Sequence, residues 1–186
     1  MPASIISVNV GLPREVEWRG ERVRTGIWKQ PVAGPVRVGK LNLEGDGQAD
    51  PAVHGGPLKA VYAYPSEHYA LWCGELDLCD LEWGSFGENL TTEGLHETTV
   101  RIGDRLRIGT VELQVTRPRY PCFKLGIRLS RPAIVKRFLL TARTGFYLSV
   151  LREGHLAAGD PIEFVASSER GPTVAEIVAA RRADEE

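Results

Sequence analysis

Short runs of apolar residues recur along the chain and are separated by glycine, proline and aspartate. The runs are rich in Val, Ile, Leu and aromatic residues, which favours β-strands, while the residues between them favour tight turns. Several short strands at close spacing are typical of a barrel. We therefore predict a mainly β fold, a closed or nearly closed β-barrel with a few flanking α-helices, built from Ser4–Val10, Arg22–Trp28, Ala60–Tyr64, Arg105–Ile108, Val111–Thr116, Phe146–Leu151 and Ile162–Val165.

Helical patterns are fewer. Ser66 is placed to cap a helix that runs to about Leu76, and Ser130 to cap one over Arg131–Ala142. In the second helix the apolar residues recur at helical spacing and predict one buried face: Ile134, Val135, Phe138 and Leu139. A capping-box pattern at Thr173–Glu176 predicts a last helix. We expect one β-domain over residues 1–170 and a C-terminal helix within 171–186.

Composition narrows the class of protein. The chain has 186 residues, of which 42% are hydrophobic and 25% charged, which is typical of a globular protein that buries its own core. A net charge of −1 disfavours a general nucleic-acid or membrane-surface binder. No signal peptide or spanning segment is evident, so we expect a cytoplasmic protein without a membrane partner. Three cysteines without a close C-x-x-C pair predict reduced thiols: Cys73, Cys79 and Cys122.

Cys122 is the strongest candidate for chemistry. It lies among Arg117, Arg119 and Lys124, and nearby cations stabilise the thiolate, which is the reactive and metal-binding form of cysteine. Pro121 has no N–H for a sheet ladder, so we expect the chain to leave its strand here and present the sulfur on a loop or strand end. A small buried hydrophobic residue is the alternative interpretation of Cys122.

Two glycine-containing segments are further candidates. The polar loop Leu43–Lys59 ends in Gly55 and Gly56, whose backbone can approach a ligand closely, while His54 and Lys59 can donate hydrogen bonds to oxyanions. The segment Phe86–Leu90 offers the amide of Asn89 to a polar heterocycle. Both segments are also typical of surface turns. The scattered histidines form no H-E-x-x-H motif, which disfavours a zinc hydrolase, and a Cys122–His54 nucleophilic pair is left open.

Taken together and in order, these motifs resemble the MOSC family, the C-terminal domain of molybdenum cofactor sulfurases. The motifs are His54-Gly55-Gly56 with Lys59, Phe86-Gly87-Glu88-Asn89-Leu90, Ile102-Gly103-Asp104 and Pro118–Leu125. Leu41–Asp50 and Gly145-Phe146-Tyr147 narrow the resemblance to the stand-alone bacterial YiiM-like branch. The resemblance implies a β-barrel, a molybdenum cofactor (molybdopterin with Mo) rather than pyridoxal phosphate, and reduction of N-hydroxylated compounds such as hydroxylaminopurine.

The resemblance also implies roles for single residues. Cys122 would ligate molybdenum, for which a soft thiolate is suited, and His54 would supply protons. The cofactor would be bound by His54, Gly55, Gly56, Lys59, Asn89, Arg117, Arg119 and Lys124.

The partners expected from this reading are a small N-hydroxylated substrate and a separate electron-donating reductase. The reductase is needed because the sequence carries no flavin, nicotinamide or iron–sulfur fingerprint. A homodimer is left open. Relatives of this branch often continue into a three-helix bundle, of which the helix after Thr173 resembles only the beginning. The alternatives are a sulfur or cofactor carrier that uses Cys122 without turnover, and a cofactor-free barrel.

Overall fold

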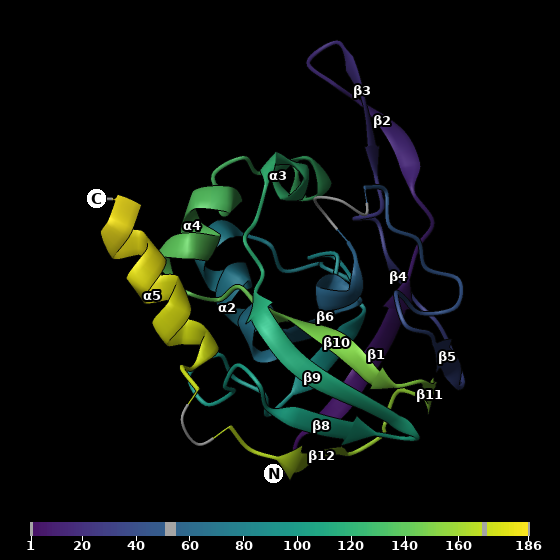
Figure 1. Ribbon diagram of the computed structural model, residues 1–186. Coiled ribbons are helices and arrows are strands. Elements are labelled where there is room, and N and C mark those ends of the chain that lie inside the picture. The colour runs from purple at the N-terminus through teal and green to yellow at the C-terminus, as the bar shows by residue number, and fades with distance from the viewer. Residues whose placement is uncertain (1, 51–54, 169–170, 186) are drawn as a thin grey trace.

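One mixed sheet forms most of the molecule. The computed structural model describes residues 2–50, 55–168 and 171–185. Neighbouring strands of the sheet are antiparallel except for β6 and β7, which are parallel. The eight strands are, in spatial order, β12 (Ile162–Ala166), β8 (Arg105–Ile108), β9 (Val111–Pro118), β10 (Phe146–Arg152), β6 (Val61–Pro65), β7 (Leu90–Glu93), β1 (Ser4–Val10) and β4 (Gln30–Pro31) (Figure 1).

The two ends of this sheet approach each other without forming a closed barrel. The backbone N–H of Ile5 donates to the carbonyl of Asp160 (3.0 Å), and that of Ile162 to the carbonyl of Ala3 (2.8 Å). In the described part of the chain, β1 and the residues before β12 share only one isolated bridge, Ser4 with Pro161. The second half of the same edge of β1 pairs with β4 instead. The expected closed barrel is therefore not confirmed, because β1 divides this edge between two neighbours.

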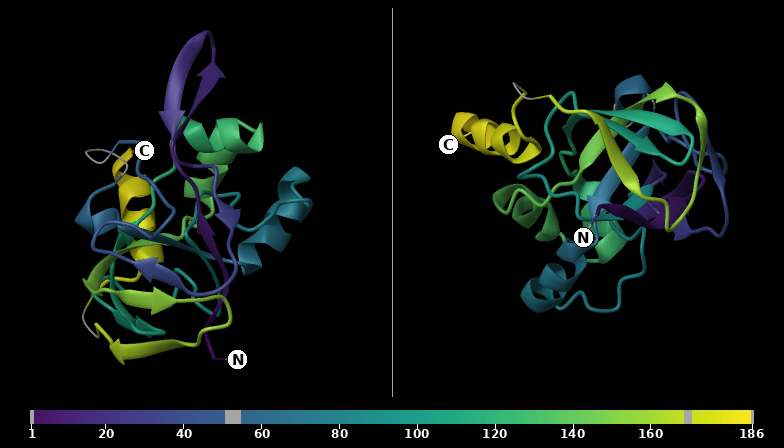
Figure 2. Two further views of the ribbon diagram at one scale, coloured as in Figure 1. Left: turned by 90° about the vertical axis from the view of Figure 1, so that its right-hand side faces the viewer. Right: turned by 90° about the horizontal axis from the view of Figure 1, so that it is seen from below.

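Two smaller sheets flank the main one. The predicted strand Arg22–Trp28 is observed as β3 (Glu21–Thr25), which ends early because its partner β2 (Arg14–Trp18) begins opposite Thr25. The two strands form a hairpin that projects from the body (Figure 2). The other small sheet joins β5 (Val36–Val38) to β11 (Gly154–Leu156). The remaining predicted strands coincide with observed strands or differ at their ends by one or two residues.

Two of the predicted helices are confirmed. Ser66 occupies the N-cap position of α2 (Glu67–Leu76) as expected, but its side chain makes no capping hydrogen bond. At α5 (Val174–Glu185) the capping box is formed in both directions: Thr173 N–H donates to Glu176 Oε2 (2.7 Å), and Glu176 N–H donates to Thr173 Oγ1 (3.1 Å). A single turn of 3₁₀ helix, η1 (Pro57–Lys59), precedes β6.

The prediction for Ser130 is wrong. Ser130 ends the preceding helix α3 (Phe123–Leu129) in a left-handed conformation with φ of 51°, and its N–H donates to carbonyls of that helix. The next helix, α4 (Ile134–Leu140), begins only after Pro132. The sequence pattern missed α3 and began the next helix too early, because a serine two residues before a proline fits an N-cap as well as the end of a helix. Ile134 and Phe138 form the buried face as expected.

Aromatic packing fixes the helices on the sheet. Tyr64, Trp72, Phe86 and Phe138 are fully buried in one cluster between β6, α2 and α4. Trp72 Nε1 donates to the Tyr64 hydroxyl (2.7 Å), and the Tyr64 and Phe138 rings stack at 5.6 Å. Burial of such rings is the main stabilising contribution of this layer. Among the described helices, none has the length and apolar character that crossing a membrane requires.

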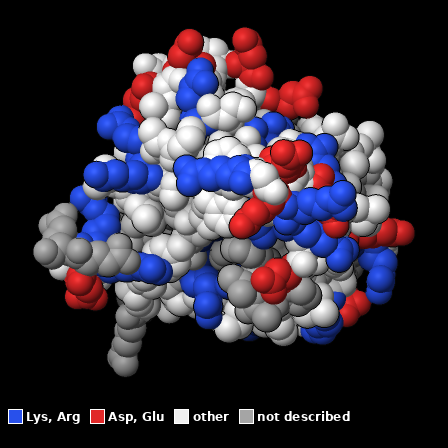
Figure 3. Space-filling model, turned by 90° about the horizontal axis from the view of Figure 1, so that it is seen from above, with Lys and Arg blue, Asp and Glu red and all other residues white. Residues whose placement is uncertain are grey.

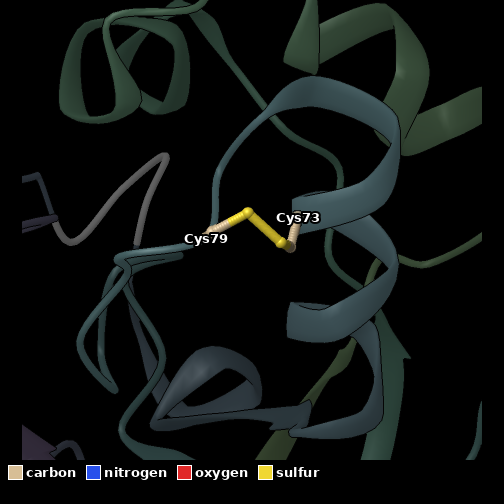
Figure 4. The surroundings of a disulfide bond; sticks show 2 residues. All are labelled: Cys73 and Cys79. Atoms are coloured by element: carbon tan, nitrogen blue, oxygen red, sulfur yellow. A yellow bond between two sulfur atoms is a disulfide. The ribbon is translucent and has the colours of Figure 1, made fainter.

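A disulfide joins Cys73 and Cys79, so the expectation of reduced thiols is wrong for this pair (Figure 4). Cys73 lies in the last turns of α2, and Asp77 ends that helix in a left-handed conformation with φ of 57°. This residue turns the chain back along the helix, so two cysteines six positions apart have Cα atoms 4.2 Å apart. Sequence spacing alone did not indicate the reversal. Cys122 is a free thiol.

The double substitution Cys73→Ser/Cys79→Ser tests this bond. A disulfide closing so short a loop stabilises the folded state by about 2 kcal/mol, chiefly by restricting the unfolded chain. We expect urea unfolding of the variant to match that of wild type treated with dithiothreitol, and both to fall below untreated wild type by that amount. Identical midpoints for treated and untreated wild type would contradict the pairing.

Candidate functional site

A pocket opens where the β3–β4 connection, the loop after β5, the start of β6 and the start of α3 meet. It brings together five of the residues predicted from sequence: Lys59, Asn89, Arg119, Cys122 and Lys124. The described lining also includes Thr25, Gly26, Ile27, Lys29, Asp46, Gly47, Gln48, Ala49, Ala60, Tyr62, Gly87 and Tyr147.

Cys122 is held at the wall of this pocket rather than in the core. Strand β9 ends at Pro118, and after Pro121 the chain begins α3 with Cys122 as its N-cap residue. The Cys122 carbonyl accepts the Leu125 N–H (3.0 Å), while the residue remains half-buried. The predicted exit from the strand is thus confirmed. A half-exposed thiol can reach a ligand, which a packed core cysteine cannot.

Arg119 is the buried cation of the pocket, with 7% of its surface exposed. Its Nη1 donates to the carbonyl of Phe86 (3.1 Å) and to the hydroxyl of Tyr62 (3.4 Å). Burial by itself disfavours the charged guanidinium, but the neighbouring Tyr62, Tyr147 and Cys122 outweigh it and raise the pKa of Arg119. No carboxylate of the described residues pairs with this cation, so its charge is available to a ligand.

Another part of the lining is electrically balanced. Lys29 and Asp46 form an ion pair whose side chains are 8% and 4% exposed. Asp46 also accepts hydrogen bonds from the Gly11 N–H (2.9 Å) and from Asn89 Nδ2 (2.9 Å). Asn89 Oδ1 in turn accepts the N–H of Tyr62 (3.1 Å). The amide that was expected to recognise a heterocycle therefore holds Asp46 and β6 in place.

The turn at Phe86–Asn89 positions both parts of the lining. Gly87 has φ of 81°, and a Cβ there would lie 2.7 Å from Ile27 Cγ1, so only glycine fits. The buried carboxylate of Glu88 accepts hydrogen bonds from Gly84 N–H (2.8 Å), Phe86 N–H (3.1 Å), Thr91 Oγ1 (2.9 Å) and the Tyr69 hydroxyl. Burial raises the pKa of Glu88 despite these donors. The turn thereby presents a carbonyl to Arg119 and an amide to Asp46.

Two tyrosines complete the lining, and motif reasoning did not assign either a role. Tyr62 on β6 and Tyr147 on β10 are register partners with ring centroids 5.3 Å apart. The Tyr62 hydroxyl donates to the carbonyl of Thr144 (2.8 Å). Burial raises the pKa of both phenols, so both keep their protons at neutral pH. The sequence offered no signal that singles out Tyr62, because the same short run also contains Tyr64, which is buried in the core.

Other predicted residues lie outside the described lining. Arg117 is exposed on β9. Gly55 is buried. The Gly56 N–H donates to Oε1 of Gln48 (3.0 Å), so Gly56 helps to hold a residue of the pocket lining. His54 falls outside the residues that the structure describes.

Asp46→Asn tests the balanced part of the lining. The variant leaves Lys29 buried without a counter-charge, and breaking such a pair costs roughly 3 kcal/mol of unfolding free energy. Glu15→Gln is the matched control, because its ion pair with Arg22 is exposed and should contribute less than about 1 kcal/mol. Urea titrations measure both, and equal effects of the two substitutions would refute the proposed role of Asp46.

Comparisons with known proteins agree with this architecture. The family model described as "MOSC domain" matches residues 50–163. An uncharacterized protein, YflK of Bacillus subtilis, is 43% identical over 92% of this chain and 77% of its own length. A protein of Gibberella moniliformis called "Reductase" is 36% identical over 88% of this chain, which spans only 29% of that protein.

A solved structure extends the likeness to three dimensions. The crystal structure of YiiM from Geobacillus stearothermophilus superimposes with a TM-score of 0.81 and 35% sequence identity, and covers 100% of this chain and 86% of its own. This structure is of a YiiM protein, the stand-alone bacterial branch that the sequence motifs indicated. The chain belongs to the MOSC domain family.

Proposed function

We propose that this protein is a molybdenum-cofactor-dependent reductase of N-hydroxylated compounds. The observation that carries the proposal is the half-buried free thiol of Cys122 in one pocket with the cations Lys59, Arg119 and Lys124. Membership of the MOSC family supports a role related to the molybdenum cofactor, and the relative named a reductase supports redox chemistry.

The donor set of the pocket fits such a cofactor. Molybdopterin carries a phosphate and a dithiolene, so it needs cations and a soft ligand for its metal. Cys122 supplies the soft ligand, and Lys59, Arg119 and Lys124 supply the cations. Within the described residues no group of three or more His, Cys, Asp or Glu is placed to hold a metal ion. Cys122 would supply a thiolate ligand to the metal.

Two parts of the pocket lining would bind different parts of the ligand. Arg119 is a fixed positive charge on the side of Cys122, whereas the charge of Lys29 is cancelled by Asp46. The anionic part of a ligand is therefore favoured beside Arg119 and Lys124, and a neutral part beside Tyr62 and the balanced pair. Asn89 contributes by holding Asp46 rather than by contacting the ligand first.

The overall reaction adds two electrons and two protons to R–NHOH and gives R–NH₂ and water. When bound, the molybdenum cofactor would supply the two-electron chemistry. Tyr147 lines the pocket with its proton retained on Oη, so it would donate a hydrogen bond to the hydroxyl oxygen of the substrate. His54 remains a second proposed proton source.

Cys122→Ser is the direct test. From a host that makes molybdopterin, wild type should carry molybdenum and reduce 6-N-hydroxylaminopurine with reduced methyl viologen. The variant should lose the metal and the activity, because a serine hydroxyl is a hard, protonated ligand. Cys73→Ser/Cys79→Ser is the matched control, since it removes two sulfur atoms that lie outside the described pocket lining. This variant should keep both the molybdenum and the activity.

The outcomes separate the competing functions. Bound cofactor in wild type without turnover, or a persulfide on Cys122, would favour a carrier. Molybdenum-free wild type from the same host, with Cys122→Ser unchanged in every measurement, would overturn the proposal in favour of a cofactor-free protein.

Tyr147→Phe tests the proton donor. Loss of the hydroxyl should lower kcat about 100-fold, the size typical of a missing general acid, while molybdenum and pterin content stay at the wild-type level. Tyr64→Phe is the control, because its hydroxyl lies outside the described lining and donates to the carbonyl of Arg143, so its loss should cost about 1 kcal/mol of stability instead. Wild-type kcat in Tyr147→Phe would remove Tyr147 from the mechanism.

A further inference from the structure

Positive charge is concentrated in one stretch of an otherwise balanced chain. The whole protein has 23 Lys and Arg against 24 Asp and Glu. Residues 117–144 contain no acidic residue at all, and eight cations: Arg117, Arg119, Lys124, Arg128, Arg131, Lys136, Arg137 and Arg143. This stretch builds the end of β9 together with α3 and α4, and it includes Cys122.

Some of these cations serve the fold and others face solvent. Arg137 and Arg143 both pair with Glu75 of α2 (2.7 and 2.6 Å), and Arg119 is buried in the pocket. In the described part of the chain, no carboxylate pairs with Arg117, Lys124, Arg131 or Lys136, which we call the basic surface. Arg117, Arg131 and Lys136 are exposed, and Lys124 is half-buried.

The basic surface is continuous with the pocket. Lys124 belongs to α3 and lines the pocket beside Cys122, the N-cap residue of the same helix. Helix α4 follows α3 and packs against it, so Arg131 and Lys136 extend the positive charge outward from the pocket. Viewed from the end of the molecule that carries α3, Lys and Arg side chains run in a broad band across the face (Figure 3).

We propose that the basic surface docks an acidic electron-transfer protein that carries a reduced flavin or an iron–sulfur cluster. The inference rests on the proposed function, because that reaction consumes two electrons and this sequence carries no flavin, nicotinamide or iron–sulfur fingerprint. A flavin hydroquinone supplies both electrons and becomes the oxidised quinone; two reduced [2Fe–2S] clusters supply one each. The two protons come from solvent, with Tyr147 and His54 as the proposed donors.

The chemistry of the surface suits this occupant. Electron-transfer complexes are typically small and transient, and complementary charge sets their encounter rate and orientation. Lys124 lies in the pocket, and Arg131 and Lys136 lie on the segment that follows α3, so an acidic partner is guided toward the place where its electrons are needed. A long nucleic acid is disfavoured, because the chain as a whole is slightly negative and would repel phosphates beyond the basic surface.

Arg131→Gln/Lys136→Gln tests the proposal, and Arg37→Gln/Lys40→Gln is the matched control. Both double variants remove two positive charges from exposed residues, and neither touches the pocket lining; Arg37 and Lys40 lie at β5, across the molecule from α4 (Figure 1). The probes are a flavodoxin and a plant-type [2Fe–2S] ferredoxin, both acidic, and a fluorescently labelled duplex DNA.

We expect wild type and the control to bind at least one of the two proteins at low salt, and to lose binding as salt is raised. The Arg131/Lys136 variant should bind about 10-fold more weakly. Turnover with that reduced protein should fall in parallel, whereas turnover with methyl viologen should equal that of wild type.

The results distinguish the two proposals. Three outcomes would overturn the docking site: neither protein binds, both double variants weaken binding equally, or only the DNA binds tightly. In each case, turnover with methyl viologen would still support the reductase. Salt-sensitive protein binding lost only in Arg131→Gln/Lys136→Gln, without any turnover, would uphold the docking site and reject the reductase.

Discussion

The guanidinium of Arg119 is the interaction on which the pocket depends. It joins the segment after β9 to the carbonyl of Phe86 and the hydroxyl of Tyr62, so three parts of the chain distant in sequence meet at one buried cation. A buried charge must be satisfied by hydrogen bonds or neutralised by a partner. The protein supplies the hydrogen bonds but, among the described residues, no carboxylate. That imbalance leaves one positive charge of the lining without a carboxylate partner, next to Cys122.

The other buried cation of the lining, Lys29, is neutralised by a carboxylate. Lys29 is equally buried, but Asp46 cancels its charge and Asn89 holds Asp46 in position. The pocket lining therefore has one charged part and one neutral part, although cations lie in both. Counting cations in the sequence does not distinguish these parts, because the distinction depends on which carboxylate folds against which amine.

Charge segregation links the pocket to the outer surface. The stretch 117–144 contributes only positive charges, and Glu75, the acid that pairs with two of them, comes from α2. The pairs with Glu75 fasten α4 to the aromatic layer, where Phe138 stacks on Tyr64 and Trp72. The same short segment thus stabilises the fold on one side, through Arg137 and Arg143, and carries unpaired charge on the other.

Local sequence predicted β1, β6, β8, β9, β10 and β12 to within two residues at their ends, the helix at Thr173, the exit of the chain at Pro121 and the placement of Cys122 among cations, because these depend on neighbouring residues. It did not predict β2, β4, β5, β7 or β11. It failed where the chain reverses on itself: a left-handed Asp77 brings Cys73 to Cys79, and a left-handed Ser130 ends α3, a helix that the pattern did not predict. Only the tertiary structure committed the amide of Asn89 to the protein, turned Arg117 out of the pocket and brought Tyr147 in. These outcomes depend on contacts between residues far apart in sequence, which a linear pattern does not specify.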